Sequence, residues 1–182
     1  MTLKQMLFGL VLISTLGACN TTMPVSQEID QKPLDLRNGQ VVSIRSAYTA
    51  KCMDVANGST TVGNWIVQFG CHGQTNQQFV LDSVVAPIIR FRNVNSNLCV
   101  AATGYQGYST PRMNLVQSTC NSAYANFTLE NLVTSANSTT ATLRWAYDSA
   151  YCVDVPSGAA IDSLILQIYP CHGGQNQRWI IR

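Results

Sequence analysis

The cysteines divide this chain of 182 residues into three similar parts. Six of the seven cysteines form three sequence-adjacent pairs, with separations of 19, 21 and 19 residues. Each pair lies in one copy of a repeated pattern, and the copies span Val41–Leu81, Ile88–Leu129 and Thr142–Arg182. We name these copies block one, block two and block three. A unit of about 40 residues cannot bury its own apolar face, so the three blocks are expected to pack around a shared core.

Each block has the pattern of several short strands. The segments VVSIRS, IIRFRN and TLRWAY alternate apolar and polar residues, which is typical of half-buried strands. Further short apolar segments follow, separated by Gly-containing turns, and no window beyond the N-terminal segment has a sustained helical period. We therefore predict an all-β, barrel-like fold with about four strands in each block and about twelve in total. The aromatic residues near the block ends, Phe79, Phe127 and Trp179, are predicted to point into the common core.

The regular cysteine spacing favours disulfides within the blocks, although six cysteines allow 15 connectivities. The expected pairs are Cys52 with Cys71, Cys99 with Cys120, and Cys152 with Cys171. Each bridge would close a loop of about 20 residues and stabilise the fold by roughly 3 kcal/mol. Zinc is the alternative for cysteines next to histidines. Adjacent Cys-His steps lack the spacing of metal ligands, so we expect no metal and no other cofactor.

The N-terminal segment is predicted to be an export signal. Lys4 precedes the apolar run Met6–Leu16, which is too short to cross a bilayer and fits the core of a signal peptide at residues 1–18. Cys19 follows Gly17-Ala18, an arrangement that resembles the lipobox of bacterial lipoproteins, whose Cys is lipidated. An ordinary signal peptide followed by an unrelated Cys is the alternative.

The same resemblance implies an outer-membrane location, since Asn20 rather than Asp follows the Cys. Residues 19–37 are then the lipidated N-terminus and a polar tether with two prolines. Residues 38–182 remain as the folded domain.

The three blocks together resemble the ricin-B type β-trefoil. Each block combines paired cysteines with an ending related to the Gln-x-Trp motif of that family. The motif is intact in Gln177-Arg178-Trp179, while Gln77-Gln78-Phe79 is a close variant and Ala125-Asn126-Phe127 lacks the Gln. The resemblance covers residues 41–182. It implies a β-trefoil of three pseudo-symmetric repeats that binds sugars, most often galactose or N-acetylgalactosamine.

The resemblance also implies where a sugar would bind. The family uses an Asp after the first Cys of a repeat, an aromatic residue before the second Cys, and an Asn-Gln step before the final aromatic residue. Block three has all the expected types, namely Asp154, Gln167, Tyr169, Asn176 and Gln177. The carboxylate would accept sugar hydroxyls, the Asn amide would donate and accept, and the Tyr ring would pack against the apolar face of the sugar.

The other two blocks match this pattern less well. Block one retains Asp54, Phe69, Asn76 and Gln77, but Val67 stands where block three has Gln167. Block two has different residue types at the corresponding places, namely Ala101, Ser118 and Tyr124-Ala125. Block two is therefore predicted to be structural. An Asp that only holds loop amides is the alternative for blocks one and three, and the Gln of each motif is expected to support its loop. His72 and His172 receive no predicted role.

Several classes of function are excluded by composition and motif. Charged residues make up 11% of the chain and the net charge is +2, which does not suit a nucleic-acid partner. The chain has no nucleophile elbow, P-loop or His-Glu-x-x-His motif. Asp54 and Asp154 belong to different blocks, so a glycosidase pair is not expected. We therefore predict that the protein is not an enzyme.

A lipobox, a short tether and one trefoil together resemble the carrier subunits A and C of cytolethal distending toxin. Those subunits bind the host cell and deliver a nuclease chain. The resemblance implies a glycan-binding toxin subunit with companion subunits, held at the bacterial outer membrane by its lipid or secreted. The alternative hypothesis is a protein-interaction trefoil with vestigial sugar pockets.

Overall fold

The computed structural model describes residues 36–85, 87–103 and 113–182, which all lie in one compact unit, residues 31–182. The predicted signal peptide and Cys19 lie outside the described residues, as does nearly all of the predicted tether. No helix in the described part of the chain is long and apolar enough to cross a membrane.

The described residues form fourteen strand segments and five short 3-10 helices. Block one holds β1 (Val41–Val42), β2 (Ile44–Ser46), β3 (Cys52–Val55), η1 (Ala56–Gly58), β4 (Ile66–Phe69), η2 (Thr75–Gln77) and β5 (Phe79–Val85). Block two and the residues that follow it hold β6 (Ile88–Asn93), β7 (Cys99–Ala102), β8 (Met113–Ser118), η3 (Ala123–Ala125) and β9 (Phe127–Ser135). Block three, with the residues that lead into it, holds β10 (Ser138–Trp145), β11 (Tyr151–Asp154), η4 (Pro156–Gly158), β12 (Leu164–Ile165), β13 (Gln167–Pro170), η5 (Gln175–Gln177) and β14 (Arg178–Ile181).

These segments correspond to the predicted twelve strands. A single residue, Ser43, separates β1 from β2, and Leu166 separates β12 from β13. Each of these pairs therefore acts as one interrupted strand, which leaves four strands in every block.

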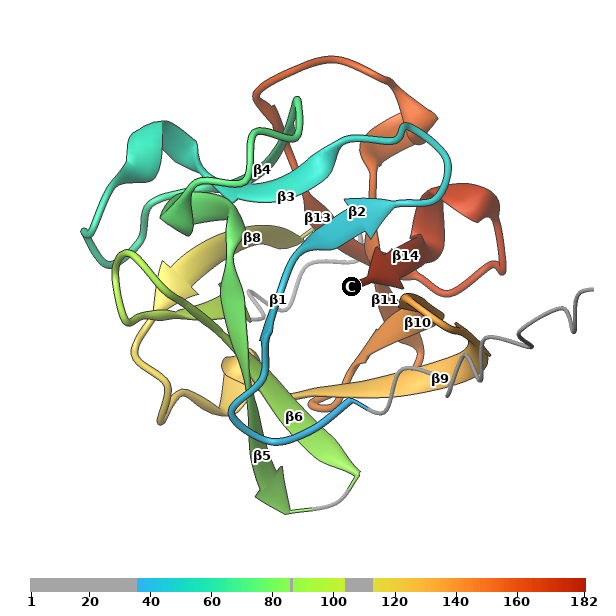
Figure 1. The fold of residues 1–182 in the computed structure, drawn as a ribbon, viewed down its shortest axis with the longest axis horizontal. Helices are drawn as coiled ribbons and strands as arrows, with labels where there is room; N and C mark the ends of the chain where they lie inside the picture. Colours follow the sequence, from blue (N-terminus) through green and yellow to red (C-terminus); the bar gives the residue numbers. More distant parts are fainter. Residues whose placement is uncertain (1–35, 86, 104–112) are drawn as a thin grey trace, which may run out of the picture. The chain divides into compact units, whose positions relative to one another are not determined.

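The first and last strands of the blocks close into a ring (Figure 1). The pairing runs from β1 to β5, β6, β9, β10 and β14, and β14 returns to β2, with every pair antiparallel. The last strand of each block pairs with the first strand of the next, through Phe79 with Asn93, Phe127 with Trp145, and Trp179 with Ser46. The ring therefore holds the three blocks together as one barrel.

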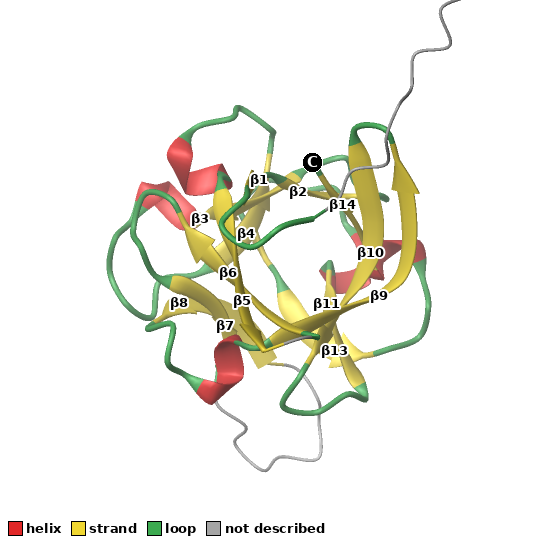
Figure 2. Ribbon diagram, turned by 60° about the horizontal axis from the view of Figure 1, so that its bottom comes forward, coloured by secondary structure: helices red, strands yellow, loops and turns green. Residues whose placement is uncertain are grey.

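The remaining strands form three hairpins outside this ring (Figure 2). They are β3–β4, β7–β8 and β11–β13, one from each block. Neighbouring hairpins also pair with one another, because β12 joins β4, β13 joins β8, and Trp65 makes a bridge to Val116. A ring of six strands with three hairpins agrees with the all-β, barrel-like fold predicted from the strand pattern and with the β-trefoil that the family resemblance implied.

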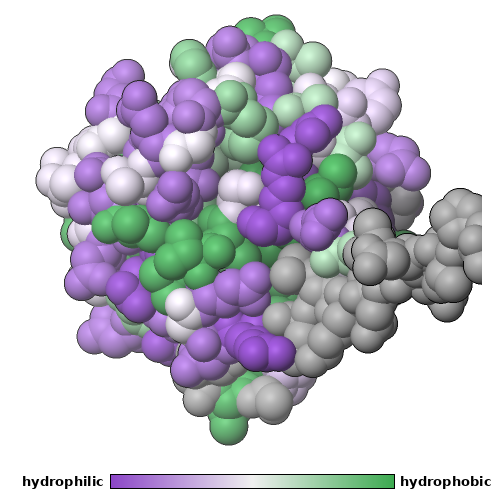
Figure 3. All heavy atoms as spheres, viewed as in Figure 1, coloured by the Kyte–Doolittle hydropathy of each residue, from purple (hydrophilic) through white to green (hydrophobic). Residues whose placement is uncertain are grey.

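The core lies inside the ring and confirms the predicted inward aromatic residues. Phe79, Phe127 and Trp179 are all 0% exposed. Burial alternates along the strands, since Trp179 and Ile181 of β14 are buried while Arg178 and Ile180 are half-buried. Burying each large side chain stabilises the fold by roughly 1.5–3 kcal/mol. On the face in Figure 3, hydrophilic residues cover most of the rim and hydrophobic residues gather nearer the middle.

The three predicted disulfides are present. Cys52 pairs with Cys71, Cys99 with Cys120, and Cys152 with Cys171. In each block the bridge joins the start of one hairpin strand to the residues just after the partner strand, with Cα–Cα distances of 5.1, 4.9 and 5.1 Å. Each bridge therefore fixes the loop that carries the Asn-Gln step of its block, or the residues that replace this step in block two.

Candidate functional site: two equivalent hollows

The block-three hollow is built from strand ends. Asp154 is the last residue of β11, and it lies opposite Gln167, the first residue of β13. Tyr169 stands two residues after Gln167, so both side chains lie on the same face of that strand. Asn176 comes from η5. These four predicted residues line a hollow of about 500 Å³, which has the size of a small-molecule site.

The carboxylate of Asp154 is the polar centre of this hollow. Asp154 is 1% exposed, and each of its oxygens accepts a hydrogen bond of 2.8 Å, one from Gln167 Nε2 and one from Asn176 Nδ2. Burial raises the pKa of Asp154 above its ordinary value of 3.8, and the hydrogen bond from Gln167 opposes this shift. The side chain is therefore a desolvated acceptor that its neighbours hold in one orientation.

His172, to which the sequence analysis assigned no role, also faces this carboxylate. Its Nε2 lies 3.4 Å from Asp154 Oδ2, and its Nδ1 accepts a hydrogen bond of 3.1 Å from the backbone N–H of Gly174. Because Nδ1 is an acceptor, the proton of the neutral ring is on Nε2 and points to the carboxylate. The ring stands edge-on to Tyr169, with centroids 6.1 Å apart. A signal for this role was present in the sequence, because His72 and His172 stand at the same position in blocks one and three, directly after the second cysteine.

Tyr48 is a second lining residue that the motif comparison missed, because it belongs to block one. It follows β2, and its ring lies against Gly158 of η4. A Cβ on Gly158 would come within 2.9 Å of Tyr48 Cε1, and Gly158 has a φ of +64°. Glycine is therefore required at position 158 for two reasons: a side chain there would clash with the Tyr48 ring, and the positive φ is strained for other residues. Ser157, His172 and Gln175 complete the lining.

A second hollow of about 450 Å³ lies at the equivalent place in block one. Asp54, Phe69 and Asn76 line it, as the sequence predicted. Val67 also lines it and lies opposite Asp54 in the β3–β4 pair, as Gln167 lies opposite Asp154 in block three. The apolar Val67 cannot donate to Asp54, so the two hollows differ at this position.

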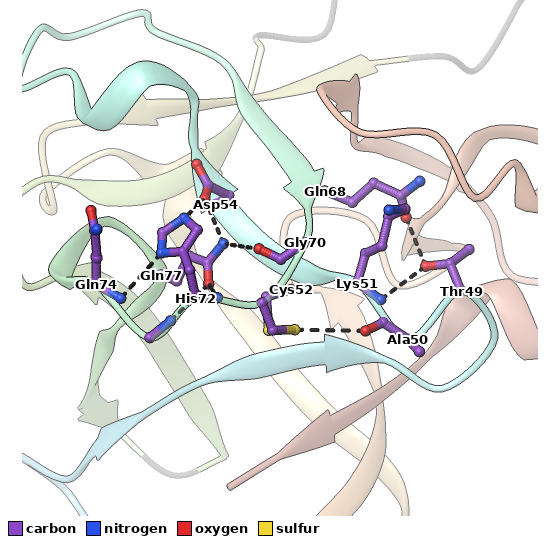
Figure 4. Close-up of a disulfide and its surroundings, with 12 residues drawn as sticks. Thr49, Ala50, Lys51, Cys52, Asp54, Gln68, Gly70, His72, Gln74 and Gln77 are labelled. Atoms are coloured by element: carbon purple, nitrogen blue, oxygen red, sulfur yellow. Dashed lines mark hydrogen bonds and ion pairs between the residues drawn. A yellow bond between two sulfur atoms is a disulfide. The ribbon is translucent and has the colours of Figure 1, made fainter.

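Other donors hold the Asp54 carboxylate (Figure 4). Asp54 Oδ1 accepts from Asn76 Nδ2 at 3.0 Å, and Oδ2 accepts from Gln77 Nε2 at 2.7 Å. His72 Nε2 lies 3.2 Å from Oδ2, and its Nδ1 accepts from the N–H of Gln74. Burial raises the pKa of Asp54, and the Gln77 hydrogen bond and the nearby His72 oppose this. Asn76, Gln77 and His72 therefore hold the Asp54 carboxylate without a donor at position 67.

Gln77 and Gln177 lie behind the hollows and line neither of them. Each is 1% exposed and clamps the loop after its disulfide. Gln177 accepts from the N–H of His172 at 2.9 Å and donates to the carbonyl of Pro170 at 3.0 Å. Gln77 makes the same two bonds, with His72 and Gly70. The two motif glutamines therefore support the loops that carry the histidines.

Gln68, one residue after Val67, does not contact Asp54 as Gln167 contacts Asp154, and instead joins block one to block three. It is 0% exposed and donates to the carbonyls of Ala159 and Ile161 in block three, and its own carbonyl accepts from Thr49. Gln117 of block two donates to Ser59 and Thr61 of block one in the same way. These glutamines join neighbouring blocks and do not take the place of Gln167.

Block two places no carboxylate or Asn-Gln step at the equivalent position. Ala101 and Ala125 are buried there with Cys99, and Tyr124 and Cys120 pack against them. Tyr124 also forms an aromatic cluster with Trp145 and Tyr147, with its ring centroid 5.8 and 4.9 Å from theirs. Apolar packing has therefore replaced the polar centre found in the other two blocks.

The two acids lie in separate hollows, so they do not form a pair around one bond. Among the described residues, no group of three or more His, Cys, Asp or Glu side chains is arranged to hold a metal ion. What each hollow does offer is a fixed carboxylate, an amide and an aromatic ring around an open space. This arrangement suits a neutral polyhydroxyl ligand with one apolar face.

Comparison with known proteins identifies the fold. The model of the ricin-type beta-trefoil lectin domain-like family matches residues 33–118. No curated protein matches the chain by sequence.

Solved structures match over most of the chain. A designed threefold symmetric protein, ThreeFoil, is 20% identical, with a TM-score of 0.67, over 78% of this chain and 98% of its own. The ricin B-like lectin of Macrolepiota procera, solved in complex with lactose, is 16% identical, with a TM-score of 0.62, over 81% of this chain and 98% of its own.

The cytolethal distending toxin of Haemophilus ducreyi is also similar in fold. It is 13% identical, with a TM-score of 0.56, over 76% of this chain and 80% of the toxin chain. Together with the ring of strands and the three bridged hairpins, these matches establish a β-trefoil fold, and residues 33–118 are similar to the ricin-type beta-trefoil lectin domain-like family.

Proposed function

We propose that this protein is a lectin that binds glycans in the block-three and block-one hollows. The observation that carries the proposal is the grouping of Asp154, Asn176 and Tyr169 around one hollow, repeated by Asp54, Asn76 and Phe69. The carboxylate and the amide would bind adjacent sugar hydroxyls, and the exposed ring face would take the apolar face of the sugar.

The proposed ligand class is a glycan ending in galactose or N-acetylgalactosamine. The lactose complex of the Macrolepiota procera lectin supports this choice, since lactose contains galactose. A single shallow hollow of this kind would bind at roughly millimolar strength, about −4 kcal/mol. Two hollows on one body would raise the apparent affinity for a surface that carries many copies of the glycan.

A glycan array tests this proposal. The exported chain carrying Cys19→Ser would be compared with the same chain carrying Asp54→Ala and Asp154→Ala. We expect the first protein to be retained on galactose-type glycans and the second to lose retention while keeping its far-ultraviolet circular dichroism spectrum. Equal retention of the two proteins would contradict a role for the hollows.

We further propose that the protein is a lipid-anchored cell-binding subunit of a bacterial toxin. The lipobox-like sequence that ends at Cys19 and the fold shared with the Haemophilus ducreyi toxin support this idea. Labelled palmitate should enter the native chain and not the Cys19→Ser variant, and the native chain should fractionate with the outer membrane. A nuclease-like protein encoded beside this chain should copurify with it. Without such a companion, the protein acts as a lectin alone.

A protein-interaction role is the second candidate, and the cluster of Tyr124, Trp145 and Tyr147 favours it. Tyr147 is 55% exposed, and exposed aromatic rings are common at protein interfaces. In this case Tyr147→Ala should weaken partner binding, and the double Asp variant should leave it unchanged. The opposite result would assign partner recognition to the hollows.

A further inference from the structure

The block-one hollow carries a second aromatic ring, Trp65, at a position where block three has Ile165. The second ring of the block-three hollow, Tyr48, comes from a different part of the chain. Trp65, Val67 and Phe69 occupy alternate positions along β4 and the residue before it, so their side chains share one face. All three line the hollow. Ile165, which lies opposite Val67 on β12, lines it as well. The hollow therefore has an apolar wall with an aromatic ring at each end.

The same positions differ in block three. Equivalent positions of blocks one and three differ by 100 in residue number in this region. Trp65, Val67 and Phe69 of block one therefore correspond to Ile165, Gln167 and Tyr169 of block three. Of these three, only Gln167 and Tyr169 line the block-three hollow. The wall of the block-one hollow therefore includes the Trp65 position, whereas the equivalent residue Ile165 is not part of the block-three hollow.

The Trp65 ring is presented by a fixed backbone. Trp65 forms a bridge to Val116 of block two, and its carbonyl accepts from the N–H of Ala56 at 3.1 Å. Asn64 Nδ2 donates to the carbonyl of Ala56 at 2.9 Å, which ties the same turn together. Trp65 nevertheless remains 40% exposed and Phe69 38% exposed. Both rings therefore offer accessible surface inside one hollow.

We propose that Trp65 forms a second sugar subsite, so that the block-one hollow recognises an oligosaccharide of at least two rings. The inference rests on the proposed lectin function. Positions 65 and 69 are about 13 Å apart along a strand, which is longer than one sugar ring. The terminal ring lies on Phe69 beside Asp54, and the next ring or rings reach Trp65 across the apolar surface of Val67 and Ile165.

The test uses a protein in which only the block-one hollow can bind. In the Asp154→Ala background, Trp65→Ile installs the residue found at the equivalent position of block three. Tyr147→Ala is the matched control, because it removes another exposed aromatic side chain that lines neither hollow. Calorimetric titrations with galactose and lactose, and an array of longer galactose-terminated oligosaccharides, measure the ligand preference. A melting curve checks that each variant folds.

We expect Trp65→Ile to weaken binding of lactose or the longer oligosaccharides by about 3- to 10-fold and galactose binding by less than about twofold. The control should change neither. Equal weakening for one ring and for several rings, or no weakening, would overturn the second subsite and leave the lectin proposal intact. Loss of all sugar binding in the Asp154→Ala protein would also overturn it. A parent protein that retains no glycan at all would instead reject the lectin function itself.

Discussion

Replacing Asp154 with Asn tests the polar centre of the block-three hollow without changing its shape. In the native protein, Gln167 Nε2 and Asn176 Nδ2 each donate to a different carboxylate oxygen at 2.8 Å. His172 Nε2 lies 3.4 Å from the oxygen that Asn176 also contacts. An Asn side chain has only one oxygen, so its NH2 group must face at least one of these donors.

Two effects on stability oppose each other in this variant. A buried donor without an acceptor costs roughly 1–3 kcal/mol of the free energy of unfolding. Removing the charge relieves the desolvation that raises the pKa of Asp154. Because these effects offset one another, we expect the stability to change by no more than about 2 kcal/mol. The affinity for sugar has no such opposing effect, because the ligand only loses a hydrogen-bond acceptor. Losing one charge-assisted hydrogen bond of roughly 1.5–3 kcal/mol should weaken sugar binding about 10- to 150-fold.

The assay is calorimetric titration with galactose in proteins that also carry Asp54→Ala, with lactose as a second probe. The pH dependence adds an independent readout. Binding to the native residue requires the ionised carboxylate, so it should weaken as the pH falls through the raised pKa of Asp154, above the ordinary value of 3.8. The Asn variant should lack this dependence. Unchanged affinity, or the same acid loss in both proteins, would refute the assignment of Asp154 as the ligand acceptor.

The same residue links stability to pH. Since its pKa is higher in the folded chain, the folded state binds more protons between 3.8 and that pKa, and the contribution of Asp154 to stability falls as the pH rises through this window. The Asn variant should therefore lose this part of the dependence in melting curves recorded at several pH values. Identical profiles of melting temperature against pH for the two proteins would show that the burial of Asp154 does not cause the pH dependence of stability.

Three further changes test the scaffold. Replacing Cys99 and Cys120 with Ser opens a loop of 21 residues and should cost about 3 kcal/mol, lowering the melting temperature by roughly 6–12 °C; a shift under 2 °C, about the lower end of what 1 kcal/mol produces, would contradict it. Gln177→Ala removes two hydrogen bonds made by a buried side chain and should cost about 2 kcal/mol, with faster amide exchange at His172 as the specific sign. Phe127→Ala leaves a cavity in the shared core and should cost about 3–5 kcal/mol in chemical unfolding, and a loss below 1 kcal/mol would place the ring outside the core.

The sequence predicted the fold well because its signals are repeated three times. A single alternating segment such as IIRFRN is ambiguous, but three copies in register with paired cysteines restrict the strand pairing. Phe79, Phe127 and Trp179 could be assigned to the core because each follows the second cysteine of its block at nearly the same distance. The interruptions at Ser43 and Leu166 could not be predicted, since each arises where one strand changes its pairing partner in the folded protein.

The site was predictable only within a block. Asp154, Tyr169 and Asn176 follow from the motif, whereas Tyr48 and Trp65 do not. Tyr48 reaches the block-three hollow from block one. Trp65 lies in block one beside its own hollow, but block three has Ile165 at the equivalent position, so a comparison of the motifs does not single it out. Gln68 illustrates the same limit, since its side chain joins two blocks by donating to the carbonyls of Ala159 and Ile161. Contacts between blocks depend on the packed trefoil, which no single repeat specifies.

Block two provides an internal control for the meaning of the buried acids. It forms the same bridged hairpin and contributes the same strands to the ring with Ala101 where the other blocks have Asp. The trefoil therefore does not need a carboxylate at this position in order to fold. Burial raises the pKa of both Asp54 and Asp154, so each ionised acid carries a desolvation cost at neutral pH that Ala101 avoids. A costly charge that the fold can omit, held beside an aromatic ring in an open hollow, supports the proposed role of these acids in ligand binding.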